Sequence, residues 1–129
     1  MKAITIWQPY AQAIALGLKK FETRSWATKY RGKLAIHASL KLLSKECKLL
    51  VEKYNIKDCA LGEVIAVADL VDCVLMTDEF IKAQSEAERD FGDWRVGRFA
   101  WKLENIKVLK NPVKLSGKQG LWNFVYFSD

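Results

Sequence analysis

The alternation of apolar and polar residues along the chain predicts a succession of short β-strands. Six segments have strand character: the alternating runs 2–7, 21–26 and 33–39, the run 63–76, and the closing runs 98–109 and 121–127. The run 63–76 is apolar on both faces, as expected for a strand enclosed in a barrel or beneath helices. Turns at Asn111-Pro112 and Ser116-Gly117 are expected to separate the two closing strands.

Apolar residues at intervals of three and four predict three helices between these strands. They run from Gln8-Pro9 to Gly17, across roughly residues 40–54, and from a cap at Thr77 or Asp78 to Gly92-Asp93. Strands and helices do not alternate as they do in βαβ units. We therefore predict a single α+β domain over residues 1–129, with a small mixed sheet or barrel and about three helices packed outside it.

The composition narrows the class of protein. Half of the 129 residues are hydrophobic and 28% are charged, which is ordinary for a globular domain. No apolar run approaches the ~18 residues of a membrane-spanning helix, and no signal-peptide pattern is present. The three cysteines are odd in number and lack C-x-x-C spacing, which favours a reduced, cytoplasmic location and no zinc site. The glycines form no nucleotide-binding loop, so we expect no cofactor.

The formal charge of +6 is unevenly distributed along the chain. Residues 17–33 contain six basic residues and one acid, and residues 95–118 contain seven and one. Residues 62–93 contain nine acids and two basic residues. Such segregation indicates one electropositive face, which is typical of proteins that bind phosphate backbones, although surface lysines also serve solubility alone.

The first basic segment contains the pattern Gly17-x-Lys19-x-x-Glu22-x-Arg24. Its carboxylate, Glu22, lies among six cations and shares a predicted strand face with Arg24 and Trp26. The carboxylate either holds a lysine or arginine in place or takes part in proton transfer. Both interpretations favour an anionic ligand.

Several further segments, together with this pattern, resemble the ASCH domain family. They are Trp7-Gln8-Pro9-Tyr10-Ala11, Arg31-Gly32-x-Leu34-x-Ile36-His37-Ala38, Gly62-Glu63-Val64, Phe99-Ala100-Trp101 and Gly120-Leu121-Trp122. The resemblance covers nearly the whole chain. It implies a PUA-like β-barrel, a cleft lined by the motif, and a role in binding RNA or another nucleic acid. Some members are described as small hydrolases that act on a modified nucleoside, and others as ribonucleases.

By this resemblance, Lys19 points into the cleft as an anion anchor or, if desolvated, as an activated amine. Glu22 occupies the position at which some hydrolase members carry a threonine, so it cannot repeat hydroxyl chemistry. It is expected to pair with Lys19 or Arg24, or to act as a general base. The alternatives are a surface lysine and a structural ion pair. Arg24 has the fork geometry that suits a phosphate or a carboxylate.

The other candidate ligand-binding residues flank the motif or lie beside turns. Trp7 and Trp26 are candidates for stacking on a base, although tryptophan in a small domain usually belongs to the core. His37, the only histidine, faces either the cleft or the core, and a single histidine excludes a multi-histidine metal site. The remaining candidates are Gln8 and Gln119 for a base edge, Pro9 for contact with the ligand, and Lys29 and Arg31 for phosphates.

Two functions follow from these residues. The first is a binding module for RNA, single-stranded nucleic acid or a nucleotide. The second is a hydrolase, an amidohydrolase or a ribonuclease, with Lys19 and Glu22 as the catalytic pair. A third and weaker interpretation is protein interaction through the acidic segment 78–90. We expect a monomer that binds neither a membrane nor a metal ion.

Overall fold

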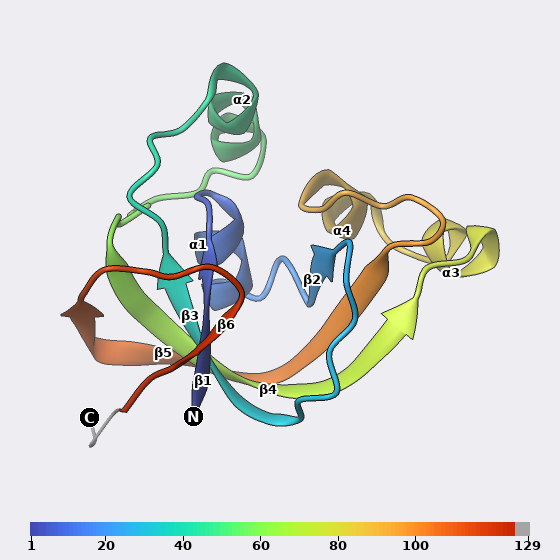
Figure 1. The fold of residues 1–129 in the computed structure, drawn as a ribbon. Coiled ribbons are helices and arrows are strands. Elements are labelled where there is room, and N and C mark those ends of the chain that lie inside the picture. The colour runs from blue at the N-terminus through green and yellow to red at the C-terminus, as the bar shows by residue number, and fades with distance from the viewer. Residues whose placement is uncertain (126–129) are drawn as a thin grey trace.

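The computed structural model describes residues 1–125 and has a six-stranded mixed sheet at its centre (Figure 1). The strands lie in the order β2-β5-β4-β3-β1-β6. Their bounds are β1 Lys2–Ile6, β2 Phe21–Arg24, β3 Gly32–Ala38, β4 Glu63–Leu75, β5 Phe99–Lys114 and β6 Leu121–Asn123. The pair β1–β3 is parallel and the other pairs are antiparallel.

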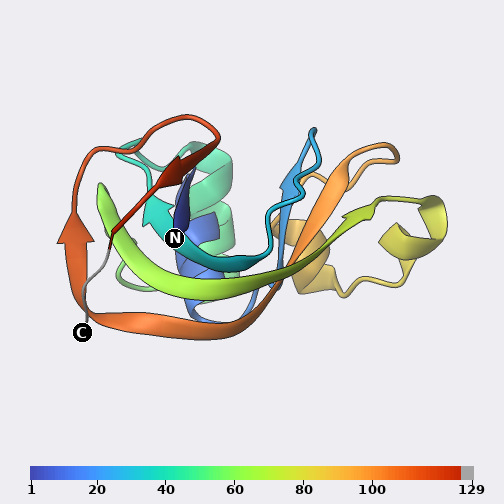
Figure 2. The same cartoon turned by 60° about the horizontal axis from the view of Figure 1, so that its bottom comes forward.

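Four short helices accompany the sheet, and they lie on one side of the long strands β4 and β5 (Figure 1). They are α1 Tyr10–Ala15, α2 Lys45–Lys53, α3 Asp78–Lys82 and α4 Glu86–Asp90. The predicted α+β, PUA-like architecture is confirmed. The sheet curls strongly, as Figure 2 shows, but it stays open and is not a closed barrel.

The main core lies where β1, β3, β4 and β5 meet α1. Ile4, Leu34 and Trp101 are fully buried in it, and Ala11 and Ile14 bring the apolar stripe of α1 against the sheet. No helix among residues 1–125 is long and apolar enough to cross a membrane.

Two predicted helices differ from the structure. The second begins later than expected because Ser44 caps it by accepting a hydrogen bond from the Cys47 amide, which leaves Leu40 outside the helix and 69% exposed. The third is split into α3 and α4. Ser85 accepts a hydrogen bond from the Glu88 amide and so starts a new helix within the expected one.

The predicted turn at Asn111-Pro112 is wrong, because β5 continues through it. Val113 pairs with Val64, whereas Val108 already pairs with Ala66, so residues 109–112 form a bulge opposite Ile65. A bulge leaves residues unpaired and therefore tolerates a proline that cannot donate a hydrogen bond. Ser116-Gly117 does lie between β5 and β6. The last strand ends at Asn123, and the predicted strand residues 126 and 127 lie outside the described part of the chain.

Candidate functional site

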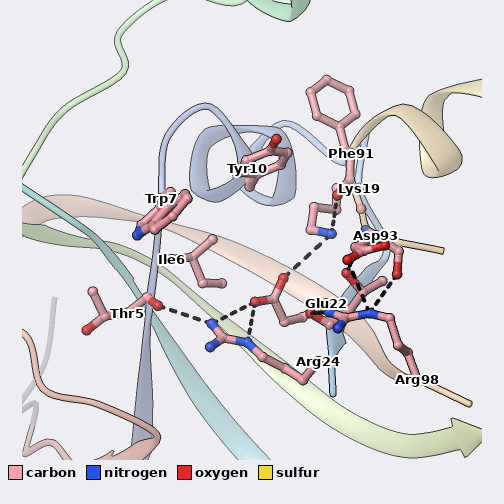
Figure 3. Close-up of a pocket in the computed structure, with 12 residues that line it drawn as sticks. Thr5, Ile6, Trp7, Tyr10, Lys19, Glu22, Arg24, Phe91, Asp93 and Arg98 are labelled. Carbon is pink, nitrogen blue, oxygen red and sulfur yellow. Dashed lines mark hydrogen bonds and ion pairs between the residues drawn. The ribbon is translucent and has the colours of Figure 1, made fainter. Parts of the chain in front are cut away.

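A pocket of about 480 Å³ opens between β1, α1, β2 and the segment that follows α4 (Figure 3). Two parts of the chain that are far apart in sequence form most of its wall. Twelve residues line it: Thr5, Ile6, Trp7, Tyr10, Lys19, Glu22, Thr23, Arg24, Phe91, Gly92, Asp93 and Arg98. All three charged residues of the motif are among them.

The carboxylate of Glu22 lies near the middle of the pocket residues in Figure 3. Its Oε2 atom accepts a hydrogen bond of 2.8 Å from Arg24 Nε, and Arg24 Nη2 lies 2.8 Å from the same oxygen. Its Oε1 atom lies 3.6 Å from Lys19 Nζ. Glu22 and Arg24 interact because alternate residues of β2 project to the same face, as the sequence predicts.

Lys19 is almost completely buried, with 1% of its surface exposed. Gly17 lies between α1 and Lys19, and its φ of +79° allows the chain to reverse direction after the helix. Its Nζ donates a hydrogen bond to the carbonyl oxygen of Phe91. Burial lowers the pKa of the Lys19 ammonium below its ordinary value of 10.5, and the negative charges of Glu22 and Glu88 oppose this shift. The residue is therefore a buried amine and not a surface lysine.

Arg24 connects β2 to β1, although these strands are not paired in the sheet. Its Nη2 donates a hydrogen bond of 3.1 Å to the carbonyl oxygen of Thr5. About a quarter of the side chain is exposed, and its Nη1 has no partner among residues 1–125. The guanidinium is thus held in one orientation while one nitrogen remains able to bind a ligand.

The opposite wall contains Asp93 and Arg98, which the sequence analysis did not select. Arg98 Nε donates a hydrogen bond of 2.9 Å to the carbonyl oxygen of Asp93, and Nη2 donates a long one of 3.5 Å to that of Thr23. The carboxylate of Asp93 accepts hydrogen bonds from Arg95, which lower the pKa of Asp93, and it also lies 3.7 Å from Arg98 Nε. The high basic content of residues 95–118 was the available signal, but it did not identify which residue enters a pocket.

Tyr10 also lines the pocket and was missed. Burial, followed by a contact with Cys47, raises its pKa to about 12. The phenol therefore stays protonated near neutral pH and is a hydrogen-bonding group rather than a base.

Glu88 connects α4 to the backbone of the motif. Its buried carboxylate accepts hydrogen bonds from the backbone amides of Lys20, at 2.9 Å to Oε2, and Phe21, at 2.9 Å to Oε1. The Asp93 amide donates in turn to Thr23 Oγ1 at 3.1 Å. Hydrogen bonds to ionised acceptors are about twice as strong as neutral ones, so Glu88 should set the position of the motif backbone.

The two candidate tryptophans occupy different places. Trp7 lines the pocket with 54% of its surface exposed, and Lys41 Nζ lies 3.2 Å from the centre of its ring. Trp26 follows β2 and packs edge-on against the buried Trp101, outside the pocket lining. A ligand contact by Trp26 stays a prediction.

Three other candidates are buried, and the polar side chains among them bind other groups of the protein. The Gln8 side chain donates to the Ala60 carbonyl and accepts from the Gln12 amide. Pro9 is buried at the start of α1. His37 contacts the Leu115 carbonyl through Nε2 at 2.7 Å and Thr5 Oγ1 through Nδ1 at 3.2 Å. None of the three lines the pocket, so of the two orientations considered for His37 the structure has the core one.

Lys29, Arg31 and Gln119 are exposed and lie outside the pocket lining. Arg31 donates to the carbonyl oxygens of Thr28 and Tyr30, both at 2.9 Å. Their binding roles stay predictions. Among the described residues, no group of three or more His, Cys, Asp or Glu side chains could hold a metal ion.

We expect Glu88→Gln to lower the free energy of unfolding by about 1.5–3 kcal/mol, because a neutral amide replaces an ionised acceptor of two backbone amides. Urea denaturation measures this change. Glu79→Gln, an exposed carboxylate on α3, is the control and should change stability by less than about 0.5 kcal/mol. Equal effects of the two substitutions would contradict the assigned role of Glu88.

The titration of Lys19 provides a second prediction. Its pKa should lie below 10.5, and Glu22→Gln should lower it further, because the neighbouring carboxylate favours the ammonium form. Carbon-13 NMR of the lysine ε-carbon across a pH series measures both values. Glu63→Gln in β4 serves as the control and should leave the Lys19 titration unchanged. A Lys19 pKa that rises in Glu22→Gln contradicts the contact.

Comparison with known proteins identifies the family. Residues 4–113 match the model of the ASCH domain. The chain is 28% identical over 132 residues to activating signal cointegrator 1 of Homo sapiens and shows the same identity to that of Mus musculus. These alignments cover 92% of this chain and 21% of each relative, so the chain spans about a fifth of the length of these curated relatives.

Solved structures agree with the family match. The crystal structure of ASCH from Zymomonas mobilis superposes with a TM-score of 0.64 at 17% identity, covering 96% of this chain and 87% of that one. A mutant ASCH protein from the same organism gives a TM-score of 0.53 at 20% identity, covering 88% and 75%. Identities this low show the fold alone. The chain belongs to the ASCH domain family, whose PUA-like fold is associated with RNA binding.

Proposed function

We propose that this domain binds single-stranded RNA and that its pocket holds one nucleotide of the strand. The observation that carries the proposal is the shared lining of the pocket by oriented guanidinium groups and the exposed ring of Trp7. Cationic groups beside an aromatic platform are the usual means of holding unpaired nucleotides. The association of the family fold with RNA binding supports this assignment.

The size of the pocket supports a single nucleotide rather than a length of strand. About 480 Å³ falls within the range of ~300–1,000 Å³ that is typical of small-ligand sites. The flanking phosphates would then lie over the exposed basic residues of the chain. Lys29 and Arg31 are exposed and lie between β2 and β3 in the sequence.

We expect affinity for a short single-stranded RNA to fall as salt rises, because phosphate binding releases counterions. Arg24→Ala should weaken binding about tenfold or more through loss of a charged hydrogen-bond donor. The double variant Lys29→Ala, Arg31→Ala should reduce the log–log salt slope by about 1.4, at ~0.7 per phosphate contact. Fluorescence anisotropy at several salt concentrations measures both effects.

Lys107→Ala is the matched control, because this exposed lysine of β5 does not line the pocket. It should retain wild-type affinity within about threefold. Absence of RNA binding by the wild-type chain at low salt would overturn the proposal.

A hydrolase acting on a modified nucleoside is a second candidate, favoured by a specific observation. Lys19 and Glu22 form a buried pair in a pocket, and the pKa of Lys19 is lowered. A desolvated lysine beside a carboxylate is a common arrangement in catalytic sites. Arg24 also binds the carboxylate of Glu22 and holds it in place. In a hydrolase, Glu22 would then orient the Lys19 amine or relay a proton.

For this second function, we expect wild-type protein to release acetate from an acetylated nucleoside, and we expect both Glu22→Gln and Lys19→Met to abolish turnover. Chromatography of the nucleoside product measures the rate. Arg95→Gln, which changes a charge outside the pocket lining, is the control and should keep the wild-type rate. An unchanged rate in Glu22→Gln would exclude the catalytic assignment.

The interpretation as a protein-interaction module is weaker still. Glu86 and Asp90, two acids of the segment 78–90, bind Lys53 of α2 at 2.7 and 2.8 Å. Part of the acidic charge is therefore used within the domain. A partner for this surface stays a prediction.

A further inference from the structure

We propose that Arg98, which lies outside the motif, binds a phosphate group, so that the pocket prefers a phosphorylated nucleotide to a free nucleoside. This inference rests on the proposed nucleotide-binding function and deepens it. It also assigns an orientation: the phosphate lies at the Arg98 end of the pocket and the base lies at the Trp7 end.

The cations of the pocket differ in how far neighbouring carboxylates neutralise their charge. Arg24 makes two contacts of 2.8 Å with the Glu22 carboxylate, and Lys19 faces the same carboxylate from 3.6 Å. A single negative charge thus serves two cations. Their remaining attraction for an anionic ligand is reduced accordingly.

Arg98 differs from Arg24 because its hydrogen bonds go to neutral groups and not to a carboxylate. Its two hydrogen bonds go to the backbone carbonyls of Asp93 and Thr23. The nearest carboxylate oxygen, Asp93 Oδ2, lies 3.7 Å away and is bound more closely by Arg95. Backbone carbonyls orient a guanidinium without cancelling its charge. Of the two partly exposed arginines of the pocket, Arg98 is therefore less neutralised than Arg24, and Lys19 is too buried to be compared with them.

Arg98 is partly buried and yet accessible to a ligand. About a fifth of the Arg98 side chain is exposed, and its Nη1 has no partner among residues 1–125. A partly desolvated guanidinium with a free donor binds phosphate more strongly than a fully hydrated one. One oriented donor of Arg98 is thus available to a phosphate.

The layout of the pocket separates its aromatic ring from Arg98. Figure 3 shows Trp7 and Arg98 on opposite sides of Glu22. A base that stacks on the exposed Trp7 ring would direct its sugar phosphate across the pocket, towards Arg98. A free nucleoside would fill the Trp7 end and leave the charge of Arg98 without a partner.

Arg95 provides a matched control for Arg98. Both arginines contact Asp93 and both belong to the loop before β5, but only Arg98 lines the pocket. Substituting either one removes the same formal charge from nearly the same place. A difference between the two variants therefore reports direct contact and not the general electrostatic field.

The test measures the binding of adenosine, AMP, the dinucleotide ApA and inorganic phosphate by calorimetry at low salt. We expect AMP to bind the wild-type protein about tenfold more tightly than adenosine does. Arg98→Gln should reduce AMP affinity to the level of adenosine and leave adenosine unchanged. Arg95→Gln should change AMP affinity less than about threefold.

The ligands also distinguish the source of the phosphate. Tighter binding of AMP than of ApA indicates that the pocket takes a terminal phosphate. If AMP and ApA bind equally well, and both more tightly than adenosine, the pocket takes an internal phosphodiester. Either result supports the inference. Equal binding of adenosine and AMP, or equal losses in Arg98→Gln and Arg95→Gln, overturns it while leaving RNA binding intact. If no ligand binds and RNA does not bind either, the proposed function itself fails.

Circular dichroism should show that the Arg98→Gln protein is folded. If that variant does not fold, Arg98→Lys replaces it, since it keeps the charge and loses only the fork. It should retain a preference for AMP that is smaller than that of the wild-type protein. A preference as large as that of the wild-type protein would count against a direct guanidinium contact.

Discussion

The site depends on the burial of the Glu22 carboxylate between two cations. A buried charge without partners would destabilise the fold by several kcal/mol, whereas a carboxylate that contacts both an ammonium and a guanidinium is compensated. Lys19 and Arg24 would repel each other in its absence. Because Arg24 also holds the Thr5 carbonyl, the same carboxylate fixes the distance between β2 and β1, which are not paired in the sheet.

The site also requires contact between the motif and residues 88–93, which lie about seventy residues further along the chain. Residues 88–93 supply a carboxylate for the motif backbone, a carbonyl for Lys19 and an amide for Thr23. Each of these groups binds a different residue of β2 or the residues just before it. The complete pocket therefore forms only when residues 88–93 pack against the motif, although the contact between Glu22 and Arg24 lies within β2 itself.

This dependence explains what could be predicted from the sequence. The contact between Glu22 and Arg24 follows from strand alternation, which is a local property. Arg98 and Asp93 could not be selected, because their position depends on long-range pairing between β2 and β5. The split of the third helix was missed for another reason. The apolar spacing continues across Ser85, and a capping residue inside a continuous pattern gives a signal that periodicity alone ignores.

The two candidate functions differ in the proton that they require on Lys19. When Lys19 is protonated, it shares Glu22 with Arg24, and the pocket keeps an excess of positive charge that suits an anion. When Lys19 is neutral, Arg24 alone compensates Glu22. The amine can then act as a base, and the pocket carries one positive charge fewer. Burial favours the neutral form, while Glu22 and Glu88 favour the charged one. An approaching phosphate would add negative charge near Lys19 and so favour the ammonium. A phosphorylated ligand therefore stabilises the binding form of the pocket, and an uncharged nucleoside leaves the basic form available.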